Sequence, residues 1–180
     1  HRSGGNTARE VIEDKFPTLK LQLPEGGPKD IKTKIQYTLL KTLEARDIKK
    51  FVTILSTVAA SGNSKVDPNY WYSHCQCTCL EKAIKYPDCI EFVKALLLAN
   101  ADPNVINPST EQAPVQLAVY LHNVEAFQIL LSIKPPIDIN IQSNHSKTPL
   151  HIAVEENLPD CVEMILERSD VDVNLRDAYD

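Results

Sequence analysis

Apolar residues recur along this chain at helical spacing, in pairs of short segments. Leu150 and Ala153 lie three positions apart, and Val162, Ile165 and Leu166 repeat the same spacing a few residues later. Residues three and four apart share one face of an α-helix, so each segment predicts a short amphipathic helix whose apolar face is buried. The longest unbroken apolar runs are short, and none approaches the roughly 20 residues that a membrane-spanning helix needs. The pattern therefore predicts an all-α structure built from pairs of short helices.

Polar residues and prolines mark where these helices begin and end. Thr148 precedes Pro149, and threonine is a favoured N-cap while proline is tolerated in the first helical turn. Asn100 follows the apolar run that ends at Ala99. Because asparagine adopts the left-handed conformation more readily than most residues, we expect Asn100 to close a helix.

The helix pairs form a repeat. Equivalent segments begin at Thr78, Ala113 and Thr148, each 35 residues after the one before. A degenerate fourth copy lies upstream, since residues 47–55 align without gaps to residues 123–131. From Phe51 to the equivalent Val93 is 42 residues, which predicts an insertion of about nine residues within 56–76.

The repeat resembles the ankyrin family. The resemblance is carried by Thr148-Pro149-Leu150-His151-Ile152-Ala153 and by the segment Leu96-Leu97-Leu98-Ala99-Asn100-Ala101-Asp102-Pro103-Asn104. It implies an ankyrin-repeat solenoid, in which stacked helix-turn-helix units alternate with hairpin fingers. A single helix pair cannot bury its apolar face alone, so we expect each repeat to be stabilised by its neighbours.

These signals divide the chain into six parts. The predicted parts are the end of a truncated repeat (1–14), a connector (15–36), a degenerate repeat with a long insertion (37–76), and three repeats (77–111, 112–146 and 147–180). The array stops without the polar capping repeat that natural arrays carry, so we expect the chain to be cut from a longer protein.

Charge and cysteine content narrow the function classes. The net charge of −5 argues against a nucleic-acid partner, which needs a clustered basic face. The five cysteines are an odd number, and no secretory signal precedes them, which favours a reducing cytosolic setting over a disulfide framework.

A more specific resemblance follows from the order of features. The truncated repeat ends in residues 7–12, a connector runs from Phe16-Pro17, and a fresh array opens at Leu40. This order is similar to the N-terminal cytosolic region of insect transient receptor potential channels of the A subfamily, the painless-like branch. The resemblance implies a domain on the cytoplasmic face of the plasma membrane that couples thermal, chemical or mechanical stimuli to the gate of a homotetrameric cation channel. Its partners would be other domains or subunits of that parent, and the fragment itself would be soluble, without inserting into the membrane.

The alternative is a soluble adaptor or inhibitor that binds a protein partner on its concave face. Hairpin tips near Asn107, Glu111, Ser143 and Lys147 would then contact the target. The long connector and the irregular first repeat favour the channel.

Two clusters within the insertion have candidate chemistry. The run Tyr70-Trp71-Tyr72 is either a partner anchor, as tyrosine and tryptophan often are, or a lid that fills a gap over the first helix pairs. The run 74–79 holds three cysteines at alternate positions, a spacing too tight for tetrahedral zinc, so no metal site is predicted. Cys75 and Cys77 are candidate reactive thiols if the loop is exposed.

No catalytic or cofactor-binding site is predicted. The family context of His151 implies a structural histidine that hydrogen-bonds neighbouring loops, and no serine or cysteine nucleophile has an evident relation to His122 or His145. A phosphate-binding glycine loop is absent from the sequence. We therefore expect a binding protein, not an enzyme.

Overall fold

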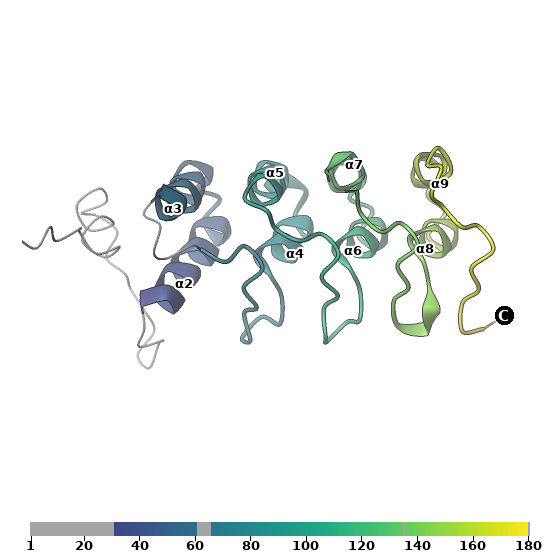
Figure 1. Cartoon of the computed structure of the whole chain (residues 1–180), viewed down its shortest axis with the longest axis horizontal. Coiled ribbons are helices and arrows are strands. Elements are labelled where there is room, and N and C mark those ends of the chain that lie inside the picture. Colours follow the sequence, from purple (N-terminus) through teal and green to yellow (C-terminus); the bar gives the residue numbers. More distant parts are fainter. Residues whose placement is uncertain (1–30, 61–65, 135, 180) are drawn as a thin grey trace, which may run out of the picture. The chain divides into compact units, whose positions relative to one another are not determined.

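The computed structural model describes residues 31–60, 66–134 and 136–179 of the chain (Figure 1). The chain divides into two compact units, residues 1–67 and 68–180. Within the described ranges, no helix is both long enough and apolar enough to cross a membrane.

The first unit contains one helix pair, α2 (Ile31–Glu44) and α3 (Ile48–Ala60), which contact each other. Asp47 caps α3, because its Oδ1 accepts a hydrogen bond from the Lys50 amide at 3.0 Å. Asn123 caps a later helix in the same way, which agrees with the predicted alignment of these two segments. The fully buried side chains of the pair include Leu39, Leu40, Leu43 and Phe51.

Two predicted boundaries in this unit differ from the structure. Helix α2 begins at Ile31, inside the predicted connector (15–36), because Ile35 and Gln36 continue the buried face one turn before Leu39 and Leu40. Helix α3 runs to Ala60, so the first five residues of the predicted insertion (56–76) are helical. The predicted truncated repeat (1–14) and residues 15–30 of the connector lie outside the described residues.

The second unit contains three helix pairs in two layers (Figure 1). The inner helices are α4 (Cys79–Ile84), α6 (Pro114–Tyr120) and α8 (Pro149–Glu155). The outer helices are α5 (Ile90–Leu98), α7 (Val124–Ser132) and α9 (Pro159–Leu166). Helices of one layer contact the next of that layer, and short 3₁₀ turns lie at Pro87–Cys89 and Asn144–Ser146. The all-α prediction is confirmed.

Extended loops, here called fingers, lead from each outer helix and project to one side of the stack (Figure 1). They comprise residues 101–113, 136–148 and 169–179. The first finger follows Asn100, whose φ of 64° is the predicted left-handed helix end.

The inner helices begin as predicted, with one exception. Thr78 and Thr148 each accept a hydrogen bond from the amide three residues later, at 3.3 Å in both cases. Proline occupies the first turn of α6 and α8. Ala113 precedes α6 and has no side-chain acceptor, so this helix lacks the cap that the other two have.

The apolar core of the second unit lies between the two layers. Fully buried side chains include Ala83, Ile84, Val93, Leu96, Val115, Ala118, Val119, Phe127, Leu130 and Ala153. In α9 the buried stripe is Cys161 and Ile165, whereas Leu166, which we expected on that stripe, is 52% exposed. The apolar residues of this segment fit two overlapping faces of a helix. The face formed by Cys161 and Ile165, four residues apart, is the one that packs against α8 and α7.

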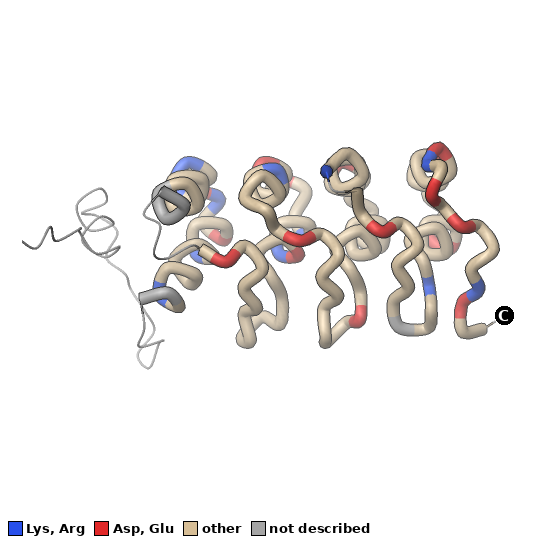
Figure 2. Tube along the Cα trace, in the orientation of Figure 1, with Lys and Arg blue, Asp and Glu red and all other residues tan. Residues whose placement is uncertain are grey.

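An Asp–Asn ladder connects one finger to the next. Within a finger, aspartate Oδ1 accepts from the amide of the asparagine two residues later, at 2.9 Å each, for Asp102 and Asn104, Asp138 and Asn140, and Asp172 and Asn174. Asparagine Oδ1 also accepts from the aspartate amide of the following finger: Asn69, in the loop before α4, from Asp102 (2.7 Å), Asn104 from Asp138 (3.0 Å), and Asn140 from Asp172 (2.8 Å). Figure 2 shows the acidic positions that recur where an outer helix passes into a finger. The ladder fixes the spacing of the fingers.

Candidate protein-binding surface

The third residue of each inner helix hydrogen-bonds to the start of that helix, and in α4 and α6 it also forms the joint between the helix and a finger. In α4 this residue is Glu81, which is 3% exposed. Its Oε2 accepts from the Thr78 amide at 2.7 Å, and its Oε1 accepts from Asn107 Nδ2 at 2.7 Å. Asn107 also donates to the Gln76 carbonyl at 3.0 Å, so the first finger is held on α4 by a buried amide.

Gln116 occupies the same place in α6 but bonds differently. Its Oε1 accepts from the Ala113 amide at 2.9 Å. Its Nε2 donates to two carbonyls of the next finger, Ile141 at 3.0 Å and Lys147 at 2.8 Å. Because the amide has both a donor and an acceptor, it satisfies the helix cap and the finger together.

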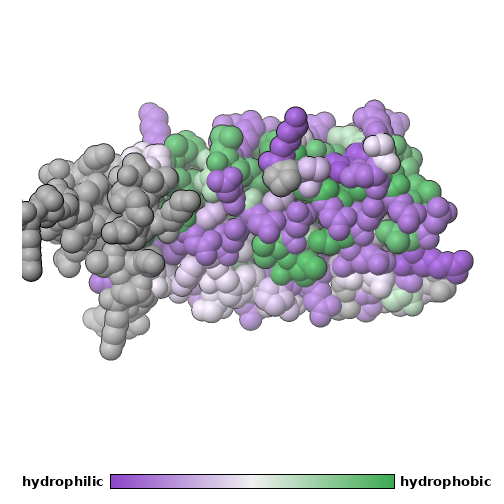
Figure 3. Space-filling view, in the orientation of Figure 1, coloured by the Kyte–Doolittle hydropathy of each residue, from purple (hydrophilic) through white to green (hydrophobic). Residues whose placement is uncertain are grey.

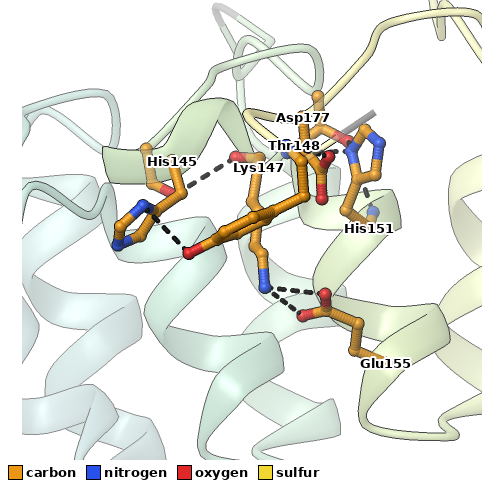
Figure 4. Close-up of polar contacts among 8 residues, drawn as sticks. His145, Lys147, Thr148, His151, Glu155 and Asp177 are labelled. Carbon is orange, nitrogen blue, oxygen red and sulfur yellow. Dashed lines mark hydrogen bonds and ion pairs between the residues drawn. The ribbon is translucent and has the colours of Figure 1, made fainter.

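His151 is the equivalent residue of α8. Its Nδ1 accepts from the Thr148 amide at 3.2 Å and lies 2.8 Å from Thr148 Oγ1 (Figure 4). The ring is therefore bound to the start of its own helix, and the described residues give it no hydrogen bond to a neighbouring loop of the kind that the resemblance implies.

The exposed ends of the inner helices carry two rows of side chains at 35-residue spacing. One row is Lys85, Tyr120 and Glu155, and the other is Tyr86, Leu121 and Glu156. We call these six residues the inner-helix surface. Tyr86 is 41% exposed, Tyr120 52% and Leu121 39%, so large apolar groups face solvent in the middle of the surface. The surface changes from basic at α4, through aromatic and aliphatic at α6, to acidic at α8.

The acidic end of the surface contacts neighbouring elements through one ion pair and one histidine–carboxylate hydrogen bond. Lys147 Nζ lies 2.6 Å from Glu155 Oε1, and this hydrogen bond raises the pKa of the lysine above its ordinary value (Figure 4). His122 Nε2 lies 3.0 Å from Glu156 Oε2, a contact between the second and third repeats. Because these groups are partly exposed, each pair orients the carboxylates more than it stabilises the fold.

Lys147 also lies beneath an aromatic pair at the finger tips. Its Nζ is 5.7 Å from the ring centroid of Tyr179, and the rings of Tyr179 and His145 stack with centroids 5.5 Å apart. Tyr179 is 72% exposed. The finger tips thus present an aromatic group beside the acidic end of the inner-helix surface.

The residues of the fingers that were predicted to contact a partner differ in their exposure to solvent. Glu111 is exposed, and Ser143 and Lys147 are partly exposed. Asn107 is 3% exposed, and its side-chain amide donates to Glu81 and to the Gln76 carbonyl. The prediction that Asn107 contacts a partner is therefore wrong.

The aromatic run Tyr70-Trp71-Tyr72, which precedes α4, also contains both buried and partly exposed residues. Tyr72 is 1% exposed and cannot be a partner anchor, since its ring packs edge-on against Tyr70 at 4.9 Å and its hydroxyl accepts from the Cys79 thiol at 3.4 Å. Tyr70 and Trp71 are half-buried.

The cysteine cluster lies in a turn before α4. Cys75 is half-buried and Cys77 is 1% exposed. The exposure that would make both of them reactive thiols is therefore found only in part, at Cys75. Burial raises the pKa of the Cys77 thiol to about 12, and contact with Cys75 adds to the shift. Among the described residues, no group of three or more metal-binding side chains is placed to hold an ion.

Tyr120 and Leu121 are not among the contact residues predicted from the sequence. Position-by-position comparison of the repeats could have found them, because both lie at the end of an inner helix where the next repeat has glutamates. On the face that Figure 3 shows, the hydrophobic areas of the second unit are separated by hydrophilic ones.

The sequence is similar to known ankyrin-repeat sequences. The family model described as ankyrin repeats (three copies) matches residues 80–177. The E3 ubiquitin-protein ligase KEG of Arabidopsis thaliana is 32% identical over 87 residues, which is 48% of this chain and 5% of that protein. The chain thus spans only a small part of the length of this relative.

Proposed function

Because the chain belongs to the ankyrin-repeat family, whose members bind other proteins, we propose that it is a non-enzymatic module that binds a protein segment on its inner-helix surface. The observation that carries the proposal is the exposure of Tyr120 and Leu121 at the end of α6, with exposed Tyr86 at the equivalent place after the neighbouring helix α4. Exposed aromatic and aliphatic groups gathered at one place are typical of binding hot spots.

The charges on either side of this apolar centre specify the orientation of the partner. Lys85 lies on the α4 side and Glu155 and Glu156 lie on the α8 side. A complementary segment has an acidic side chain toward α4, an apolar anchor over Tyr120 and Leu121, and a basic side chain toward α8, where it shares Glu155 with Lys147. Reversing the direction of such a segment places like charges together, so the surface selects one orientation.

A peptide array tests this proposal. Synthetic peptides with the order acidic, apolar, basic are compared with peptides of the same composition in reversed order, with the purified chain as the probe. We expect the Tyr120→Ala/Leu121→Ala variant to lose at least about tenfold in affinity for the selected peptides, because hot-spot truncation costs about 2 kcal/mol or more.

Leu98→Ala is the matched control, because Leu98 is 85% exposed but lies on outer helix α5. Equal binding by both variants, or no preference for either peptide order, would contradict the proposal. Far-ultraviolet circular dichroism of each variant ensures that a loss of binding is not a loss of fold.

The adaptor interpretation is the one this surface supports, since an adaptor needs an exposed site for a partner. The cation-channel interpretation, with its homotetramer and its place at the plasma membrane, stays a prediction that rests on the sequence resemblance alone. The hydropathy of the full-length protein tests it, because a channel contains several apolar stretches of about 20 residues.

A further inference from the structure

We propose that Cys75 and Cys77 are a dithiol site that a peroxide converts to an intrachain disulfide. The two sulfur atoms lie 2.8 Å apart, while both residues are free cysteines in the structure. A disulfide requires sulfurs about 2.05 Å apart, so less than about 1 Å of movement separates the pair from a covalent bond.

The backbone of the turn brings the two sulfurs together. Tyr72 and Cys77 pair across the turn, with the Tyr72 amide donating to the Cys77 carbonyl at 3.0 Å. Gln76, between the two cysteines, has a φ of 49°. This left-handed residue turns the chain sharply, so Cys75 and Cys77 converge instead of being spaced along an extended strand.

A neighbouring finger holds this conformation. Asn107 Nδ2 donates to the Gln76 carbonyl at 3.0 Å and to Glu81 at 2.7 Å. Asn107 itself accepts from the amides of Ser109 and Thr110, at 2.8 Å and 3.2 Å. The geometry of the two cysteines therefore belongs to the folded stack and is lost when the stack unfolds.

The two thiols differ in access, which assigns their roles. Cys75 is half-buried and its thiol donates to the Tyr72 carbonyl at 3.7 Å, whereas Cys77 is buried. Peroxide reaches Cys75 first, and Cys77 resolves the product. The raised pKa of Cys77 keeps it protonated at neutral pH, which slows its own attack on peroxide.

The reaction balances in two steps. The Cys75 thiolate attacks one peroxide oxygen, the O–O bond breaks, hydroxide leaves, and Cys75 becomes a sulfenic acid. The Cys77 sulfur then attacks the sulfenic sulfur, the S–S bond forms, the S–O bond breaks, and the departing hydroxide takes the Cys77 proton to form water. In sum, two thiols and one hydrogen peroxide give one disulfide and two waters, with sulfur oxidised and peroxide oxygen reduced.

Mass spectrometry of the full chain tests the site. After a stoichiometric dose of hydrogen peroxide we expect a loss of about 2 Da, and a proteolytic peptide that carries the bond between Cys75 and Cys77. Cys75→Ser abolishes the loss, and the control Cys89→Ala retains it, because Cys89 is buried elsewhere. Stable sulfinic acid at Cys75, a bond between Cys75 and a different cysteine, or dimers linked through Cys75 would overturn the proposal.

Cys77→Ser alters a buried site and could disturb the fold, so a second measurement uses the unmodified chain. Phenylarsine oxide condenses with two neighbouring thiols and releases water, so it reports a dithiol without redox chemistry. We expect it to slow the alkylation of Cys75 at least about tenfold, whereas the buried Cys89 and Cys161 should react at the same rate with and without it. Alkylation of Cys75 at an unchanged rate would show that the pair does not act as one site.

Discussion

Asn104 Oδ1 accepts a hydrogen bond from the amide of Asp138, 34 residues later, at 3.0 Å. This bond is one step of the Asp–Asn ladder, and Asn104→Ala removes it without disturbing an apolar contact. We expect the free energy of unfolding to fall by about 0.5–1.5 kcal/mol, the usual contribution of one hydrogen bond. Urea unfolding followed by circular dichroism measures it.

Asn174→Ala is the control for the ladder, because the described residues give its side chain no hydrogen-bond partner in a following finger. If both variants unfold at the same urea concentration as the unmodified chain, the ladder does not contribute to stability.

Asn123 combines two roles, so its loss should cost more. Its Oδ1 accepts from the Ala126 amide at 3.1 Å and its Nδ2 donates to the Ile84 carbonyl at 2.8 Å, in a site only 6% exposed. Asn123→Ala removes a helix cap and leaves a buried carbonyl unsatisfied, which together cost about 2–4 kcal/mol. Asp47→Ala, which removes the more exposed equivalent cap, should cost less. Thermal unfolding ranks the two, and the reverse order would contradict this account.

Ala113 offers a gain of stability. It precedes α6 where the equivalent residues Thr78 and Thr148 cap their helices. Ala113→Ser supplies the missing acceptor with little added volume, and we expect it to raise the free energy of unfolding by about 0.5–1 kcal/mol. Thr148→Ala should lower it by a similar amount. A lower stability of the serine variant would indicate that the buried position has no room for a hydroxyl.

Asp170 makes stability depend on pH at the acid end. Hydrogen bonds from Arg168, at 2.8 Å from Nε and 2.5 Å from Nη2, hold the pKa of this carboxyl below its ordinary value of 3.8. Because the folded pKa is the lower one, the stabilisation is present above pH 3.8 and is lost as the pH falls through the folded pKa. The melting temperature of Asp170→Asn should therefore be lower than that of the unmodified chain at pH 6, and the difference should shrink as the pH falls below 3.8. Glu167→Gln, an exposed carboxylate nearby, should show a smaller difference throughout.

The sequence was sufficient for the features that are local. Thr78 and Thr148 cap helices because threonine at that place satisfies an amide three residues away, and Asn100 closes a helix by its own backbone preference. The repeat itself was readable because three copies are in phase.

Burial within the loops was not readable, because it depends on residues in other repeats. Asn107 looks like a finger-tip residue, yet it is buried by Glu81 and Gln76, 26 and 31 positions earlier. Likewise, the contact between Cys75 and Cys77 depends on the left-handed Gln76, a residue type that does not signal this conformation. The inner-helix surface was missed because Tyr120 and Leu121 resemble core residues in an apolar count, and only the stacked structure shows that they are exposed.

The joints that Glu81 and Gln116 form with the fingers constrain the order of the repeats. Glu81 presents only acceptors and requires the Asn107 amide as a donor, whereas Gln116 presents a donor to the carbonyls of Ile141 and Lys147. If the stack slipped by one repeat, the carboxylate of Glu81 would face two carbonyl oxygens, and no hydrogen could lie between them. At these two joints, therefore, each helix accepts only its own finger, and a domain swap or a reordered array would place mismatched hydrogen-bonding groups at the junction.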